Sequence, residues 1–112
     1  KILLASGGID AKGAIDPDAV IYNTHLGDKN GKPVLNVAKA DRILYDNRIP
    51  PKGYAIETYT FYIPDSAVSP LKVEAVLKYR SASQPLADRL LGSEAPKMPV
   101  VDMAIITDKI VF

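Results

Sequence analysis

The chain has 112 residues, of which 47% are hydrophobic and 24% are charged, and its formal net charge at pH 7 is +1. This length and composition predict a single globular domain spanning residues 1–112. Lys and Arg are scattered along the chain, and no apolar run approaches the ~20 residues of a membrane-spanning helix, so we expect neither a nucleic-acid partner nor a membrane span. The absence of cysteine excludes disulfides, thiolate metal sites and haem attached covalently to this chain.

The first half of the chain predicts short strands separated by turns. Residues 9–17 hold Asp, Gly and Pro at intervals that favour a loop with two apolar anchoring residues. Residues 19–26 alternate between two faces, which predicts a strand. Asn30-Gly31 then predicts a hairpin turn leading into residues 34–37. Residues 40–45 fit either a strand or a single helical turn.

A rigid corner is predicted over residues 46–53, and the rest of the chain is expected to be organised around it. Pro50 and Pro51 fix φ near −65° and lack backbone donors, so this segment can be neither helix nor central strand. Gly53 is expected to supply a flexible exit from the corner. Arg48 lies two residues after Asp46, and the two side chains either form an ion pair or remain separately solvated.

The second half predicts further strands and one helix. Residues 54–63 are rich in Thr, Tyr, Phe and Ile and are expected to form a central strand. Residues 71–79 alternate, so we expect the odd-numbered side chains to be buried and the even-numbered face to be wet. Residues 83–92 carry the signals of a short helix, and residues 100–112 those of a last strand. The whole predicts an all-β fold, an antiparallel β-sandwich of about six or seven short strands with at most one short helix.

Few residues offer site chemistry. His25 is the only histidine, and an ordinary structural or exposed role competes with axial ligation of a haem held by a neighbouring domain or chain. Turn capping explains the aspartates of residues 10–18, and the loop that begins at Asp28 lacks the further oxygen ligands of a calcium site. No catalytic constellation is found, so we expect no enzyme. Six of the eight aromatic residues are Tyr, which suits either core packing or an exposed platform for a sugar or protein.

Several segments resemble a known group of proteins, namely residues 15–19, His25-Leu26-Gly27-Asp28, residues 44–53 with their Asp-x-Arg-Ile-Pro-Pro-x-Gly pattern, Leu77-Lys78-Tyr79-Arg80 and residues 99–104. Over residues 9–106 the chain resembles the haem-free β-rich region at the C-terminal end of some bacterial and archaeal multihaem c-type cytochromes. The resemblance implies an exported, periplasmic or extracellular, non-catalytic accessory domain that packs beside a haem-bearing domain or subunit and positions or shields it for electron transfer. Those cytochromes carry Cys-x-x-Cys-His sites and this chain has none, so haem c is expected only in the neighbour. The alternative hypothesis is a free-standing module that binds a carbohydrate or a surface through its tyrosines.

Overall fold

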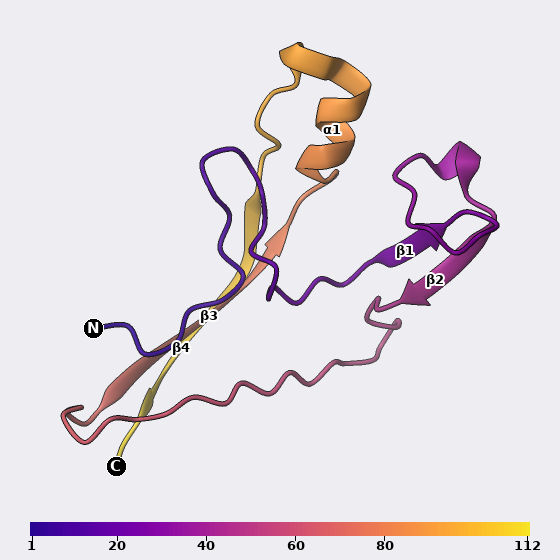
Figure 1. Cartoon of the computed structure of the whole chain (residues 1–112). Coiled ribbons are helices and arrows are strands. Elements are labelled where there is room, and N and C mark those ends of the chain that lie inside the picture. Colours follow the sequence, from indigo (N-terminus) through magenta and orange to yellow (C-terminus); the bar gives the residue numbers. More distant parts are fainter. The chain divides into compact units, whose positions relative to one another are not determined.

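The computed structural model describes all residues from 1 to 112 and divides them into two compact units. One unit comprises residues 5–59, and the other comprises residues 1–4 together with 60–112. In chain order the elements are β1 (Thr24–Gly27), η1 (Val37–Lys39), β2 (Arg42–Asp46), β3 (Leu71–Tyr79), α1 (Gln84–Leu91), η2 (Gly92–Glu94) and β4 (Val101–Ile110) (Figure 1). The chain is therefore mainly β, but its four strands form two antiparallel pairs, β1–β2 and β3–β4, rather than six or seven regular strands.

In the unit of residues 5–59, the β1–β2 pair is short. The predicted strand over residues 19–26 is reduced to β1, and the ambiguous residues 40–45 largely belong to strand β2. His25 lies directly opposite Tyr45, and the register is interrupted between His25 and Leu26. Gly27 is buried at the end of β1, where a Cβ would lie 2.5 Å from Leu44 Cδ2, so a larger residue there would require the Leu44 side chain to move.

Two loops of this unit, residues 10–14 and 28–32, have the same hydrogen bonds. In each, the leading aspartate (Asp10 or Asp28) accepts two backbone N–H groups on Oδ1, at 2.8 and 2.9 Å in the first loop and 2.8 and 3.0 Å in the second. In each, a glycine three residues later has positive φ, 86° at Gly13 and 81° at Gly31, and donates its N–H to the aspartate carbonyl. The predicted loop and hairpin turn are thus two copies of one Asp-x-x-Gly-x turn, a repetition that the sequence analysis did not recognise.

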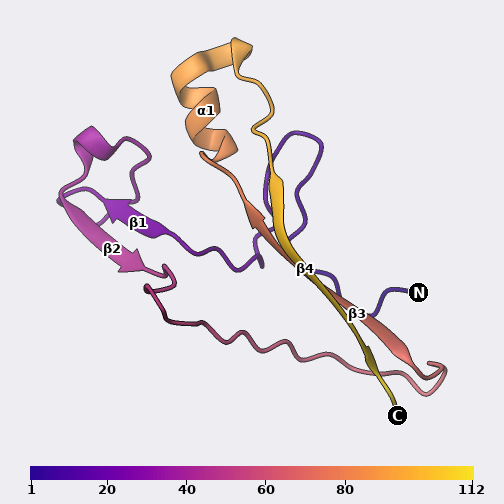
Figure 2. The same ribbon diagram turned by 180° about the vertical axis from the view of Figure 1, so that it is seen from behind.

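In the other unit, β3 and β4 form a long antiparallel ribbon. The alternation over residues 71–79 predicted β3 correctly, and the predicted last strand forms without interruption at residues 108–109. Figures 1 and 2 show the ribbon from two sides, with no further strand hydrogen-bonded to either edge.

The odd-numbered side chains of β3 are not buried as predicted. Leu77 is 42% exposed and Tyr79 is 55% exposed, and the unit that contains the ribbon has no second sheet to cover that face. The alternation therefore indicated the two faces of the strand correctly but did not determine whether the apolar face has a cover.

The predicted helix over residues 83–92 is observed as α1. Ser83 caps it, since its Oγ accepts the N–H of Leu86 at 3.3 Å. Gln84 is only 6% exposed and joins the helix to the segment before β4, because its Nε2 donates to the Pro96 carbonyl and its Oε1 accepts the N–H of Met98. Ala87, 5% exposed, is the only apolar side chain that the structure buries. None of the helices has the length and apolarity needed to cross a membrane.

Residues 54–63 do not form the predicted central strand. The segment is extended, but no backbone hydrogen bond joins it to a strand. Its anchor within residues 5–59 is a side-chain contact, in which the Tyr22 hydroxyl donates to Glu57 Oε1 at 3.0 Å. The composition of these residues indicated β propensity, but an extended segment becomes a strand only when its backbone can form hydrogen bonds with another strand.

Candidate functional site

The corner begins where β2 ends, with a bidentate contact between the Arg48 guanidinium and the Asp46 carboxylate. Arg48 Nε lies 2.8 and 3.0 Å from the two carboxylate oxygens, and Nη2 lies 2.5 Å from Oδ2. The backbone N–H of Arg48 adds a fourth bond to Oδ1 at 3.0 Å. The ion pair left open by the sequence is thus formed, and its side chains are 65% and 36% exposed. An exposed pair contributes little to stability, so its main effect is to fix the direction of the guanidinium.

Arg48 also changes the acidity of its partner. The side-chain hydrogen bonds from Arg48, followed by its backbone N–H, lower the pKa of Asp46 from 3.8 to about 2. A smaller contribution comes from the Thr24 hydroxyl on the neighbouring strand. Asp46 is therefore a carboxylate throughout the ordinary pH range, which keeps the guanidinium in place.

Asn47 fastens the corner to the segment that precedes β1. Its backbone N–H donates to the carbonyl of Asn23 at 2.9 Å, and its side-chain Nδ2 donates to the carbonyl of Ile21 at 2.8 Å. This role of Asn47 was not predicted from the sequence. The sequence feature that could have indicated it is an amide side chain shortly before Pro50 and Pro51, where the backbone has few hydrogen-bond donors.

The proline pair continues into a tight turn. The N–H of Gly53 donates to the Pro50 carbonyl at 2.9 Å, Pro51 occupies the second position, and Lys52 occupies the third with φ 57°. Positive φ at this position is typical of a type II turn and strains any residue with a Cβ. Gly53 has no positive φ; it is required because a Cβ there would lie 2.5 Å from Pro50 Cγ. The predicted flexible exit is therefore wrong, since Gly53 permits close approach and the unusual backbone belongs to Lys52.

His25 lies near the corner, on β1 opposite Tyr45. The two rings are stacked, with centroids 4.1 Å apart and an interplanar angle of 15°, and Tyr45 Oη lies 2.8 Å from His25 Nε2. Asp28, the carboxylate nearest to His25 in sequence, is bonded to its own turn. Nδ1 is the ring nitrogen without a hydrogen bond in the structure, so an iron atom would meet His25 at Nδ1 unless Tyr45 moved aside.

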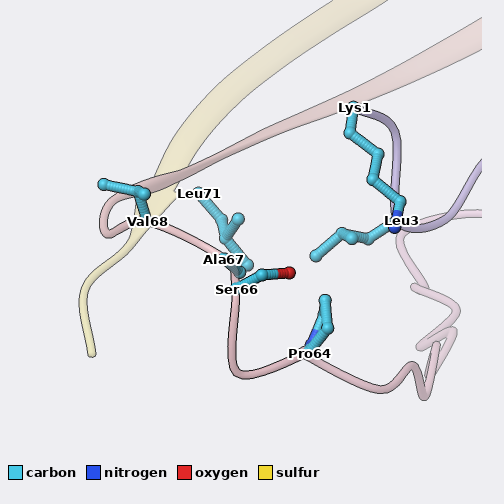
Figure 3. Close-up of a pocket in the computed structure, with 7 residues that line it drawn as sticks. All are labelled: Lys1, Leu3, Pro64, Ser66, Ala67, Val68 and Leu71. Carbon is cyan, nitrogen blue, oxygen red and sulfur yellow. The ribbon is translucent and has the colours of Figure 1, made fainter.

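Other candidate positions provide less. Asp10, Asp16 and Asp28 each hold backbone N–H groups, as turn capping predicts, and no group of three or more His, Asp or Glu side chains converges on one point. A hollow of about 230 Å³ in the unit of residues 1–4 and 60–112 is smaller than a usual ligand pocket. Figure 3 shows the residues that line it: Lys1, Leu3, Pro64, Ser66, Ala67, Val68 and Leu71.

The tyrosines are more exposed than core packing requires. Tyr54 and Tyr62 are 81% and 76% exposed, and Tyr45, Tyr59 and Tyr79 are each more than half exposed. Of the two interpretations that the sequence left open, core packing is wrong for these five tyrosines. Aromatic rings left in water are characteristic of surfaces that meet a partner or a sugar.

Comparison of the chain with models of protein families, with curated proteins and with solved structures finds no match. The conclusions about function therefore depend on the residues and contacts described above.

Asp46 makes stability depend on acid pH. Its pKa is lower in the folded chain than its ordinary value of 3.8, so its contribution to stability is complete above about pH 4 and is lost as the pH falls towards 2. Urea unfolding of the wild-type chain and Asp46→Asn should differ at pH 6 and converge near pH 2. Asp18→Asn is the control because no hydrogen bond to that carboxylate is seen. A difference that persists unchanged at pH 2 would contradict this role of the carboxylate.

Lys52→Gly should stabilise the chain by about 1 kcal/mol, because glycine adopts positive φ without the Cβ penalty. Denaturant midpoints of the two proteins measure the effect. Lys29→Gly is the matched control, since Lys29 is an exposed loop lysine without positive φ and should lose stability or stay unchanged. Equal shifts for both substitutions would mean that the backbone at Lys52 is not strained.

Proposed function

We propose that this chain is an exported, non-catalytic accessory domain that packs against a haem-bearing domain or subunit of a multihaem electron-transfer assembly. The observation that carries the proposal is the apolar surface around the rigid corner. Five large apolar side chains, which we call the corner surface, are between 41% and 81% exposed: Ile43, Tyr45, Ile49, Tyr54 and Ile56. Exposed apolar side chains in such number on one short segment are typical of a surface that a partner covers.

The corner is suited to such a role because its geometry is fixed before a partner arrives. The Arg48–Asp46 contact, the two bonds from Asn47 and the turn closed by Gly53 hold the backbone from residue 46 to 53. A preorganised surface loses little conformational entropy when it is covered. The sequence resemblance to the haem-free region of multihaem cytochromes supports a haem-bearing neighbour as the partner, and an exported location with it.

A neighbour packed against this chain would also supply the missing layer of the predicted β-sandwich. The β1–β2 and β3–β4 pairs each have two strands, which are too few to bury a face by themselves. In this proposal the sandwich is completed only in the assembly, where residues 54–63 would become the fifth strand of this chain and the neighbour would supply the remaining strands.

His25 is proposed as the residue of this chain that reaches a haem of the neighbour, through Nδ1. The haem would supply the electron transfer, and the imidazole would act as an axial ligand that tunes the reduction potential. The contact with Tyr45 fixes the ring, as hydrogen bonds to ligating histidines commonly do.

Purification of the tagged protein from its native source should bring haem with it, detected by the visible absorption spectrum. Replacing Tyr54 and Ile56 by Ser should reduce the haem absorbance recovered, because both side chains belong to the corner surface. Leu90→Ser is the control, since Leu90 is 69% exposed but lies on α1 in the other unit. A wild-type preparation without haem absorbance would contradict the proposal.

The assignment of His25 has its own measurement. In the assembled complex, His25→Met should raise the reduction potential of one haem, because a thioether ligand favours the reduced iron more than an imidazole does. Tyr45→Phe, which keeps the stacked ring and removes the hydroxyl, should shift that potential less. Potentials that stay the same for every haem after His25→Met would remove the ligand role and leave the packing role intact.

The exposure of Tyr54 and Tyr62 favours one alternative, a free-standing module that binds carbohydrate through these rings. Retention on immobilised glycans, lost when both tyrosines are replaced by Ser, together with the absence of haem from the native preparation would support this second function over the first.

A further inference from the structure

The outer edge of β4 has no partner, and its centre lacks the charges and prolines that commonly protect an edge strand. β4 pairs only with β3, and all ten of its residues are exposed. Its centre, Met103–Thr107, is five residues long and contains no charge and no proline. The three charged residues of β4, Asp102, Asp108 and Lys109, lie near its two ends, whereas those of β3, Lys72, Glu74 and Lys78, are spread along the strand. An uncharged, proline-free edge readily accepts another strand, whereas charged edges resist pairing.

The register of the ribbon sorts the side chains of β4 onto two faces. Leu77 lies opposite Ala104 and Lys78 lies opposite Asp102, so Met103 is an extra residue, a β-bulge. The residues opposite the odd-numbered face of β3 are Ile110, Asp108, Ile106, Ala104 and Val101. Those on the other face are Lys109, Thr107, Ile105 and Asp102.

Once the bulge is counted, β4 is complementary to an antiparallel copy of itself. With a two-fold axis at Ile106, the directly opposed pairs on the odd face are Ile106 with Ile106, Ala104 with Asp108, and Val101 with Ile110. On the other face they are Ile105 with Thr107 and Asp102 with Lys109. Every pair joins residues of the same face, as a continuous sheet requires, and the one pair of charged residues has opposite signs.

This register also relieves a repulsion within the ribbon. Lys72 lies directly opposite Lys109, and like charges in that position destabilise a strand pair. Asp102 of a second copy would lie beside Lys109 on its other side. Asp102 already binds Lys78 at 2.7 Å, so each row across the new sheet would contain Lys72, Lys109, Asp102 and Lys78 in that order, with Asp102 between two lysines.

We propose that the edge of β4 is a self-association surface, at which two copies of this chain pair antiparallel about Ile106. The product is a four-stranded sheet with the order β3, β4, β4 of the second copy, β3 of the second copy. The contact is isologous and therefore closes as a dimer. It uses the unit of residues 1–4 and 60–112 and is independent of the proposed haem neighbour.

The register is tested by cysteine substitution, which is clean because the chain has no other cysteine. In the dimer, opposed Ile106 positions have Cα atoms about 4.5 to 5.5 Å apart, within reach of a disulfide, so Ile106→Cys should give a covalent dimer on mild oxidation. Ala75→Cys is the matched control, because Ala75 lies opposite Ile106 on the same face but belongs to the outer strand. Its two copies would be about 14 Å apart, three strand spacings, and should not cross-link. Equal cross-linking of both variants, or of neither, would overturn the proposal.

The charge pairing is tested by exchange of signs, with the dimer measured by sedimentation velocity over a series of concentrations. Asp102→Lys and Lys109→Asp each place like charges opposite one another in both symmetry-related pairs, so each should weaken dimerisation about tenfold or more. An equimolar mixture of the two variants restores both attractive pairs and should recover the dimer. Lys78→Ala, which removes only the bridge within the ribbon, should leave dimerisation nearly unchanged. A wild-type chain that is monomeric at every concentration, or a mixture no tighter than the single variants, would overturn the proposal.

Discussion

Hydrogen bonds between the backbone and the carboxylate or amide side chains hold residues 5–59 in place where other proteins use a hydrophobic core. Asp10 and Asp28 each organise a loop, Asn36 caps η1 by accepting the N–H of Ala38, and Asn47 fastens the corner to residues 21–23. Apart from the bonds of Asn47, these bonds are local, and all of them lie at the surface, where each contributes about 1 kcal/mol. They fix the backbone without burying apolar surface, which is why the rigid corner and a large exposed apolar surface occur together.

The sequence predicted those elements whose stability is encoded locally. Ser83 before a helical pattern predicted α1, and strict alternation predicted β3, because capping and side-chain period are properties of one segment. Residues 54–63 have an equally strong strand composition, yet no ladder forms there, because a strand also needs a neighbour that the segment cannot encode by itself. The same reasoning explains the wrong burial of Leu77, since a pattern identifies a face but not what covers it.

At the corner, the spacing of Asp46 and Arg48 indicated that an ion pair was possible but left separate solvation open, and the structure shows that the pair forms. The roles of Lys52 and Gly53 could not be separated in advance, because either residue of the pair could have taken the positive φ. The partner of His25 was missed because it comes from another strand. Tyr45 is twenty residues away in sequence, and only the register of β1 with β2 brings it opposite.

The bonds of Gln84 have a consequence for the order in which the ribbon assembles. Pairing Tyr79 with Val101 closes a loop of about twenty residues, and Gln84, bonded to residues 96 and 98, already joins the two ends of most of that loop. Pairing Leu71 with Ile110 first would close a loop nearly twice as long at a greater cost in chain entropy. The order of assembly with the smallest loss of chain entropy therefore starts at the Tyr79–Val101 pair beside α1 and adds pairs outward along the ribbon. The buried Gln84 of the helix thus determines where the sheet begins to form, although its hydrogen bonds go to residues outside the sheet.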